Sequence, residues 1–294
     1  MDVSKLKARK PESVNPGKIK MLTFSKSGIG KTWLSMDFPS PYYIDCEGGA
    51  RLPHYQAKLK ESGGAYFGVE DGALDFPAIL TQVEALATER HGFKTLAFGS
   101  ITKLYQHAIA LEQARLGEKD AFGASKKPAV AWMRRLISWI QRLDMNVLFE
   151  AHEIVEWGND PKTGQRAEIG NIPDVWDKLV YELDLTLRLD KRGPSRICQV
   201  RKSRLTGFPE GDSFPCEYAE FATRYGKDFI ESTVTPLVLA TSDQVAEITR
   251  LLTVVNVEQK AIEAMLDRAK AESIAELTES QASSFIGWLK RKVA

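Results

Sequence analysis

Ser25-Lys26-Ser27-Gly28-Ile29-Gly30-Lys31-Thr32 is the stretch that decides the fold. It fits the pattern G-x-x-x-x-G-K-[ST] at every constrained position except the first, where serine replaces glycine. The apolar run 19–24 before it predicts a strand, and a helix is expected to begin at Lys31. Backbone N–H groups in such a strand–loop–helix segment converge on phosphate oxygens. The nucleotide-binding residues predicted here are Ser27, Gly28, Ile29, Gly30, Lys31, Thr32 and Trp33.

Two side chains of this loop have specific expected roles. Lys31 would place a positive charge against the β- and γ-phosphates, and the hydroxyl of Thr32 would bind Mg²⁺. ATP and Mg²⁺ are therefore the expected cofactors. The alternative is a glycine turn followed by a helix that happens to begin with lysine and threonine.

The rest of the first 232 residues alternates strand and helix patterns. Short apolar runs at 42–45, 94–98 and 146–149 are separated by segments with helical spacing of apolar residues. This alternation predicts an α/β core with a mostly parallel sheet, whose ligands bind at the carboxyl ends of the strands. The alternating leucines of 183–189 predict a hairpin with residues 197–201. The core is expected to span 18–232.

The two ends of the chain have different patterns. Residues 1–17 are basic and polar and predict a flexible tail. From Pro236 onward the pattern is purely helical, and it includes the capping box formed by Thr241 and Gln244. A small all-α C-terminal domain is therefore expected at 237–294.

Composition sets limits on the class of protein. The 294 residues carry 40 basic and 39 acidic side chains, so a nucleic-acid site would have to be a local patch. No apolar run approaches the roughly 18 to 20 residues that span a bilayer. The three cysteines lie far apart, as expected in a reducing compartment. We expect a cytoplasmic protein without a membrane partner.

The segment Tyr43-Ile44-Asp45-Cys46-Glu47-Gly48-Gly49-Ala50 resembles RecA-type recombinases, in which a strand end carries Ile-Asp-Ala-Glu. The resemblance implies a RecA-like P-loop NTPase core and places Glu47 on the glutamate that activates the attacking water. A carboxylate at a strand end beside the phosphate loop can accept a proton from that water. The alternative is a solvated glutamate in a turn.

The segment 95–102 resembles the second nucleotide motif of the same family, an apolar strand that ends in Asp-Ser. Here the aspartate position is Gly99. That aspartate normally holds Mg²⁺ through water, so the resemblance implies weaker metal binding and slow hydrolysis. Asp45 is the predicted substitute, which makes Thr32 and Asp45 the expected metal residues.

Two further segments carry expected catalytic residues by resemblance. Leu148 to Glu153 corresponds to the strand end that carries a γ-phosphate sensor, which assigns that role to His152. Val200 to Arg204 resembles a Lys-x-Lys element whose cations reach the ATP of a neighbouring subunit, which assigns Lys202 and Arg204. A structural histidine and a solvated basic strand end are the alternatives.

In the RecA-like order of elements, two loops hold single-stranded DNA, and they correspond here to 117–128 and 153–173. Both combine cations with an aromatic ring, as expected for phosphate pairing and base stacking. The predicted DNA-binding residues are Lys119, Phe122, Lys126, Lys127, Trp157, Lys162 and Arg166. Charged loops are also common on any protein surface.

Together these segments look most like compact, phage-encoded RecA-like proteins implicated in single-strand annealing and recombination. The resemblance implies head-to-tail self-association, as a ring or filament, with ATP at subunit interfaces and single-stranded DNA on the inner loops. The helical tail would then contact a single-strand binding protein. The alternatives are a nucleotide-gated adaptor for replication or recombination partners, and a P-loop small-molecule kinase.

Overall fold

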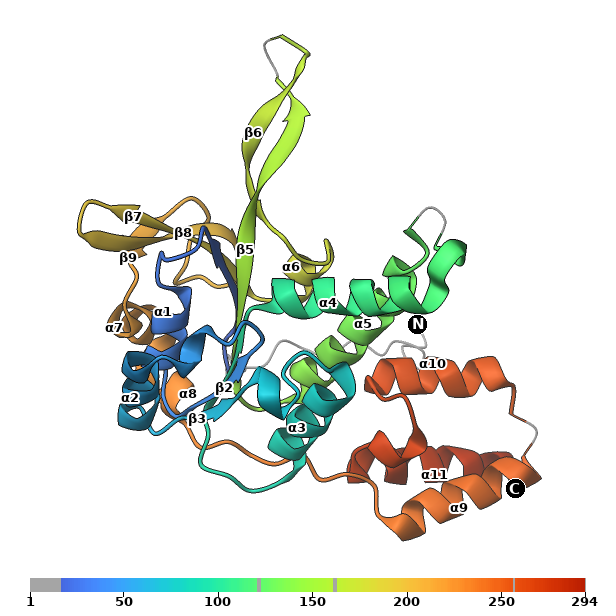
Figure 1. Cartoon of the computed structure of the whole chain (residues 1–294). Coiled ribbons are helices and arrows are strands. Elements are labelled where there is room, and N and C mark those ends of the chain that lie inside the picture. Colours follow the sequence, from blue (N-terminus) through green and yellow to red (C-terminus); the bar gives the residue numbers. More distant parts are fainter. Residues whose placement is uncertain (1–16, 121–122, 161–162, 256, 294) are drawn as a thin grey trace, which may run out of the picture.

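The computed structural model describes residues 17–120, 123–160, 163–255 and 257–293, and Figure 1 shows their arrangement. Most of the basic tail expected at 1–17 therefore lies outside the described residues. The strands are β1 Lys20–Ser25, β2 Pro41–Asp45, β3 Ala65–Phe67, β4 Thr95–Gly99, β5 Asn146–Asn159, β6 Arg166–Pro173, β7 Leu185–Arg192, β8 Ser195–Ser203 and β9 Ser213–Pro215.

The helices alternate with these strands and then continue alone. They are α1 Lys31–Asp37, α2 Pro53–Glu61, α3 Phe76–Thr88, α4 Ile101–Leu116, α5 Lys126–Arg142, α6 Leu179–Glu182, α7 Tyr218–Phe221, α8 Lys227–Glu231, α9 Ser242–Val254, α10 Gln259–Ala269 and α11 Glu279–Val293. Across the described ranges, none of these helices is both long enough and apolar enough to span a bilayer.

The strands of the described residues form one nine-stranded sheet in the order β3-β2-β4-β5-β1-β7-β8-β9, and β6 pairs with β5 alone. Every pair from β3 to β7 is parallel, and β8 and β9 are antiparallel additions. The fold class expected from the sequence is thus confirmed, as is the hairpin of β7 and β8. Because the parallel strands run the same way, the carboxyl ends of β1, β2 and β4 and the end of the buried part of β5 lie at one edge.

Helices cover both faces of the sheet, as Figure 1 shows. One core lies under α3, α4 and α5, where Ile79, Val83 and Leu86 repeat at helical spacing and are buried. The other core lies under α1, α2, α7 and α8. Phe98 and Phe149 stack across neighbouring strands with ring centroids 4.9 Å apart. Burial of each large apolar side chain contributes about 2 kcal/mol, so packing on both faces holds the strand ends rigidly.

The segment 153–173 is not the polar loop expected from the sequence. Strand β5 continues past its buried first six residues, and β6 pairs back along it, so that the two form a ribbon that stands out from the body of the protein (Figure 1). β-Branched and aromatic residues such as Ile154, Val155 and Trp157 favour this extended pairing. In the turn, the Asp160 carboxylate accepts the N–H of Thr163 at 3.2 Å.

Helices α9, α10 and α11 surround a third core that includes Ile248, Leu277 and Leu289. The expected capping box is present: the Thr241 hydroxyl accepts the N–H of Gln244 at 3.2 Å, and the side-chain Oε1 of Gln244 accepts the N–H of Thr241 at 3.0 Å. A core of its own supports the proposal that 237–294 forms a separate domain after a nucleotide-binding unit at 18–232.

The contact between these two units includes an ion pair. Arg135 of α5 donates to both carboxylate oxygens of Glu276, at 2.7 Å to Oε2, and the two side chains are only 13% and 15% exposed. Ser138 adds a hydrogen bond to the carbonyl of Lys270 at 2.7 Å. A shielded, bidentate arginine–carboxylate pair fixes the relative orientation of the two units and also stabilises their contact.

Replacing Arg135 with alanine should therefore loosen this contact. The Glu276 carboxylate would lose its paired arginine and keep the N–H of Glu272, and we expect the free energy of unfolding to fall by about 2 kcal/mol. Thermal unfolding measures that loss, and limited proteolysis should cut faster near residues 232–241. The neighbouring variant Arg134→Ala is the control, because Arg134 is exposed. Equal stability of the two variants would contradict the prediction.

Candidate functional site

A pocket of about 500 Å³ lies where the carboxyl ends of β1, β2 and β4 and the middle of β5 meet the start of α1. The residues of the phosphate loop that line it are Ser27, Gly28, Gly30, Lys31, Thr32 and Trp33. The residues from the other strand ends are Asp45, Glu47, Gly99, Ser100, Glu150 and His152. The structure thus brings together most of the residues predicted for the nucleotide site. Ile29 instead packs its side chain partly against the core under α1 and α2.

The loop backbone explains which positions need glycine. Gly28 and Gly30 have φ angles of +77° and +113°, in the region that other residues rarely adopt. Among the described non-glycine residues, positive φ occurs only at Ser40 and Lys270. Ser25 therefore occupies the first motif position without backbone strain, and the departure from glycine leaves the loop conformation intact.

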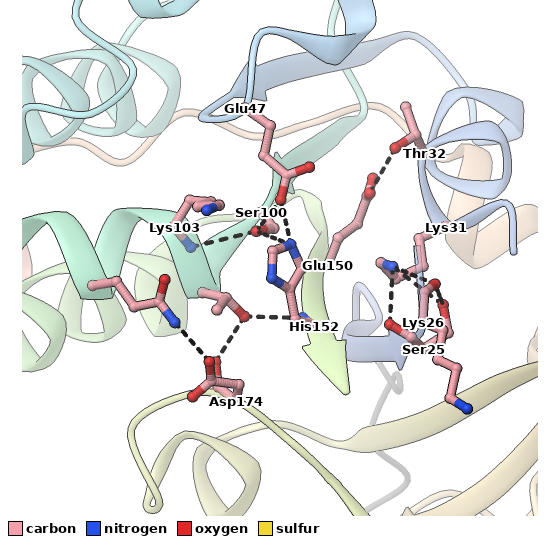
Figure 2. A network of polar contacts seen from close by, with 12 residues as sticks. Ser25, Lys26, Lys31, Thr32, Glu47, Ser100, Lys103, Glu150, His152 and Asp174 are labelled. Carbon is pink, nitrogen blue, oxygen red and sulfur yellow. Dashed lines mark hydrogen bonds and ion pairs between the residues drawn. The ribbon is translucent and has the colours of Figure 1, made fainter. Parts of the chain in front are cut away.

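The Lys31 ammonium lies over its own loop. It donates to the carbonyl and hydroxyl oxygens of Ser25 at 3.2 and 3.1 Å and to the carbonyl of Lys26 at 3.3 Å (Figure 2). Burial lowers the pKa of Lys31 from its ordinary value, although the carboxylates of Glu150 and Glu47 oppose the shift. The cation is thus held close to the place where the loop amides gather.

Asp45 has a different role from the one expected. Its side chain is almost fully buried, and its Oδ1 accepts the N–H groups of Glu47 at 3.1 Å and Gly48 at 2.9 Å. Its Oδ2 accepts the N–H of Ala50 at 2.8 Å and the hydroxyl of Tyr66 at 3.2 Å. The carboxylate is therefore used to shape the turn after β2, whereas the sequence assigned Asp45 to the metal.

Glu47, Ser100 and His152 form a hydrogen-bonded cluster at three strand ends (Figure 2). The Glu47 Oε1 accepts the Ser100 hydroxyl at 2.8 Å and lies 2.5 Å from the His152 Nε2. Burial alone would raise the pKa of Glu47, but the hydrogen bonds from Ser100 and His152 outweigh it and leave the pKa below its usual value. Glu47 is therefore held as a carboxylate, which is the form a general base requires.

The backbone also fixes His152. Its N–H donates to the Thr102 hydroxyl at 2.9 Å, and that hydroxyl donates to the carbonyl of Asp174 at 2.7 Å. The His152 carbonyl accepts the N–H of Asp174 at 2.9 Å. These bonds join the end of the buried part of β5 to α4 and to the chain after β6, so the imidazole is held beside Glu47.

A second polar cluster, not predicted from the sequence, lies deeper in the pocket. The Glu150 carboxylate is 2% exposed, and it accepts the Thr32 hydroxyl at 2.9 Å and the Tyr43 hydroxyl at 3.1 Å. Burial raises the pKa of Glu150 to about 7 and also raises that of Tyr43. Gly99 lies beside Glu150 in the register of β4 and β5.

A comparison with protein families identifies the family of this chain. The AAA domain family matches residues 17–208, which is well over half of the 294 residues. The chain belongs to the AAA domain family. No curated protein matches it.

Solved structures similar to this AAA domain protein include one titled as the RadB recombinase. The identity is 17%, the match covers 67% of this chain and 86% of that chain, and the TM-score is 0.43. Another is titled as a prototypical ATPase from the type III secretion system of pathogenic bacteria, at 14% identity, with 95% and 82% of the two chains covered and a TM-score of 0.38. Both TM-scores are below 0.5, so neither likeness indicates a function here.

Arg196 is a further cation at the nucleotide pocket of this AAA domain, and the sequence did not single it out. It is the second residue of strand β8 and lines the pocket. A Cβ added at Gly30 would lie 2.8 Å from the Arg196 Nε, so the guanidinium covers the phosphate loop. The only sequence signal was a basic residue next to the hairpin turn after Asp190.

Lys202 and Arg204 lie at the other edge of the sheet of this AAA domain. In the β7–β8 register Lys202 pairs with Thr186, near the amino end of β7. The Lys202 ammonium donates to the carbonyl of Leu183, and the Arg204 guanidinium donates to the carbonyl of Tyr181. Neither side chain lines the pocket of its own chain, so their predicted role requires a neighbouring subunit.

The predicted DNA-binding residues fall on two separate projections of the AAA domain. Lys119, Lys126 and Lys127 are exposed around the connection of α4 to α5. Trp157 and Arg166 lie on the ribbon, where Trp157 is 54% exposed and the guanidinium is 5.8 Å from its ring centroid. The two remaining predicted residues, Phe122 and Lys162, lie outside the described residues.

Proposed function

We propose that this AAA domain protein binds ATP with Mg²⁺ in the pocket and uses it to control binding of single-stranded DNA. The product would be annealing or strand pairing in DNA recombination. The observation that carries the proposal is the arrangement of Lys31, Thr32, Glu47 and His152 around one pocket at the end of a strand–loop–helix segment. This is the set of groups that phosphoryl transfer from ATP to water requires.

The residues of the pocket divide the chemistry of slow hydrolysis between them. Lys31 and Arg196 offset the negative charge that spreads over the γ-phosphoryl oxygens. Glu47 accepts a proton from the water that attacks the γ-phosphorus, while the bond to the β-phosphate oxygen breaks and ADP leaves. His152 and Ser100 hold the Glu47 carboxylate in place. Mg²⁺, when bound, stabilises charge on the phosphates.

Assembly would link this site to DNA. We propose that subunits associate head to tail, with Lys202 and Arg204 reaching the ATP of the next subunit. A nucleotide at such an interface stabilises the assembly by mass action, so slow hydrolysis would be enough to release it. DNA would contact the lysines near the α4–α5 connection and the ribbon residues Trp157 and Arg166.

The proposal is tested by titrating labelled single-stranded DNA with and without Mg-ATP over a range of salt concentrations. We expect Mg-ATP to increase both the affinity for DNA and the mass of the complex. The affinity should fall as salt rises, since phosphate contacts release counterions. Equal DNA binding with and without Mg-ATP would reject the coupling of nucleotide to DNA.

Trp157 allows a sharper test of the DNA surface. We expect Trp157→Ala to weaken binding of single-stranded DNA by about 2 kcal/mol, which is roughly 30-fold, because the exposed ring would stack on a base. Fluorescence anisotropy measures this loss. ATP binding should not change, because Trp157 lies on the ribbon and does not line the pocket.

Tyr181→Ala is the matched control for this variant. Tyr181 is the most exposed of the large hydrophobic side chains described, at 71%, and it lies on α6 rather than on the ribbon. Its loss should leave DNA affinity unchanged. If the Trp157 and Tyr181 variants bound single-stranded DNA with similar affinities, the ribbon would not be part of the DNA-binding surface.

One observation favours the adaptor as a second candidate function. Between 153 and 173 the sequence has four carboxylates against two cations, which is unfavourable for binding phosphates. The ribbon also exposes Ile154, Val155, Ile169 and Ile172, as protein-contact surfaces often do. In this reading, the ribbon and the helical domain recruit proteins such as a single-strand binding protein. ATP-dependent capture of that protein without DNA binding would support it.

A further inference from the structure

Gly99 occupies the position at which the second nucleotide motif normally has an aspartate, and side chains from the two neighbouring strands fill the space beside it. Gly99 ends β4, and its partners in register are Asp45 of β2 and Glu150 of β5. A Cβ added at Gly99 would lie 1.8 Å from the Tyr43 hydroxyl and 3.4 Å from the Glu150 Oε2. An aspartate at 99 would therefore collide with the Tyr43 hydroxyl. The space is occupied by the phenol of Tyr43 and the carboxylate of Glu150.

The Glu150 carboxylate also contacts the residue that a metal at this loop would use. The Thr32 hydroxyl donates to the Glu150 Oε2 at 2.9 Å, and both residues line the pocket (Figure 2). In P-loop NTPases Mg²⁺ is held by the hydroxyl of the loop serine or threonine and by an acidic side chain. The pairing of Thr32 with Glu150 therefore brings together the two protein groups that such a metal requires.

The donor set fits magnesium. Mg²⁺ takes oxygen ligands and is usually bound through one or two carboxylates together with phosphates and water. Within the described ranges, no group of three or more histidine, cysteine, aspartate or glutamate side chains is arranged to hold a metal by itself. One hydroxyl and one carboxylate beside a phosphate loop match a metal that arrives with the nucleotide.

The other two carboxylates of the pocket, Asp45 and Glu47, hydrogen-bond to groups other than Thr32. Asp45 accepts three backbone N–H groups and the Tyr66 hydroxyl. Glu47 is bonded to Ser100 and His152. Of the pocket carboxylates, only Glu150 contacts Thr32.

We propose that Glu150 supplies the carboxylate that holds Mg²⁺ at the nucleotide site, and that Tyr43 positions it. The carboxylate is thus carried by β5 instead of β4, and Gly99 is required because Tyr43 and Glu150 take its side-chain space. The inference rests on the proposed binding of Mg-ATP. It assigns the metal to a residue two positions before His152, so one strand supplies both the metal carboxylate and the expected γ-phosphate sensor.

The test measures how much Mg²⁺ strengthens nucleotide binding. ADP is titrated calorimetrically in MgCl₂ and in EDTA. For each variant, the dissociation constant in EDTA is divided by the dissociation constant in MgCl₂, and this ratio is compared between variants. We expect Glu150→Gln, which keeps the size of the side chain but removes its charge, to reduce that ratio by at least about tenfold. Binding in EDTA should persist. Free Mn²⁺ counted by electron paramagnetic resonance in the presence of ADP gives a second readout.

Glu156→Gln is the matched control, because Glu156 is a half-buried carboxylate on the same strand but does not line the pocket. Its ratio should equal that of the unmodified protein. An unchanged ratio in Glu150→Gln would overturn the metal assignment and leave the proposed function standing. Absence of ADP binding by the unmodified protein would overturn both.

A further variant covers the case in which Glu150→Gln does not fold, which circular dichroism would show. Glu150→Asp keeps the charge but withdraws it by one methylene, so we expect an intermediate ratio and weaker Mn²⁺ binding. A ratio equal to that of the unmodified protein would count against the proposal.

Discussion

Replacing Lys31 with alanine is expected to raise the dissociation constant for ATP by about a hundredfold. The ammonium would make charge-assisted hydrogen bonds to phosphate oxygens, and their loss costs about 3 kcal/mol at tenfold per 1.4 kcal/mol. The variant should still fold, because the Lys31 ammonium donates to oxygens of Ser25 and Lys26 in its own loop. Calorimetry with Mg-ATP measures the change.

Lys60→Ala is the control for charge, since Lys60 is an exposed lysine on α2 that does not line the pocket. It should bind ATP as tightly as the unmodified protein. If Lys31→Ala also bound ATP with undiminished affinity, the phosphate loop would not be the nucleotide site, and the proposed function would lose its main support.

The variant Glu47→Gln should bind ATP normally and lose its hydrolysis. A glutamine can still accept the Ser100 hydroxyl, so the local structure is kept, but an amide cannot take the proton of the attacking water. General-base catalysis contributes at least about a hundredfold, and we expect turnover to fall by that factor. Phosphate release under single-turnover conditions measures it, since slow hydrolysis would be hard to follow otherwise.

Glu61→Gln serves as the control for Glu47, because Glu61 is exposed at the end of α2 and away from the pocket. The two variants should differ in turnover and agree in ATP affinity. Equal turnover would mean that another group takes the proton, and the hydrogen-bonded cluster of Glu47, Ser100 and His152 would then be structural.

The phosphate loop could be predicted from the sequence because its chemistry is local. The strand before it, the two glycines with positive φ and the Lys31-Thr32 pair are contiguous, so the order of residues alone defines the site. The alternation of strands and helices is local in the same sense, and it was sufficient for the mostly parallel sheet. Glu47 and His152 were predicted from a resemblance to the strand ends of a known family. The fold places the Glu47 Oε1 2.5 Å from the His152 Nε2.

Glu150 could not be predicted because its role comes from strand order. It is 118 positions from Thr32 in the chain, and the two meet only because β5 lies between β1 and β4. In the sequence it appears as one polar residue after an apolar run. The contacts of Asp45 could not be predicted either, because the direction of a strand-end carboxylate depends on the following turn, whose N–H groups it accepts.

The ribbon and Arg196 were missed for related reasons. Charged residues interrupt the alternation of apolar and polar residues in the ribbon strands. The pairing of β5 with β6 is therefore seen only in the folded structure. Arg196 reaches Gly30 because β8 folds back onto β7. A hairpin can be predicted from spacing, but the group that the second residue of β8 covers depends on the three-dimensional path of another segment.

The length of β5 has a mechanical consequence. It is a single strand of 14 residues, about 45 Å at 3.3 Å per residue, and it runs from the buried sheet into the outer ribbon, where its register with β6 shifts between Glu156 and Trp157. Glu150 and His152 lie where its buried part meets the ribbon, so the ribbon would act as a lever arm with its fulcrum at the pocket. A load on the far end would exert a torque on the two side chains at the fulcrum. By reciprocity, any nucleotide that changes their position would tilt the arm.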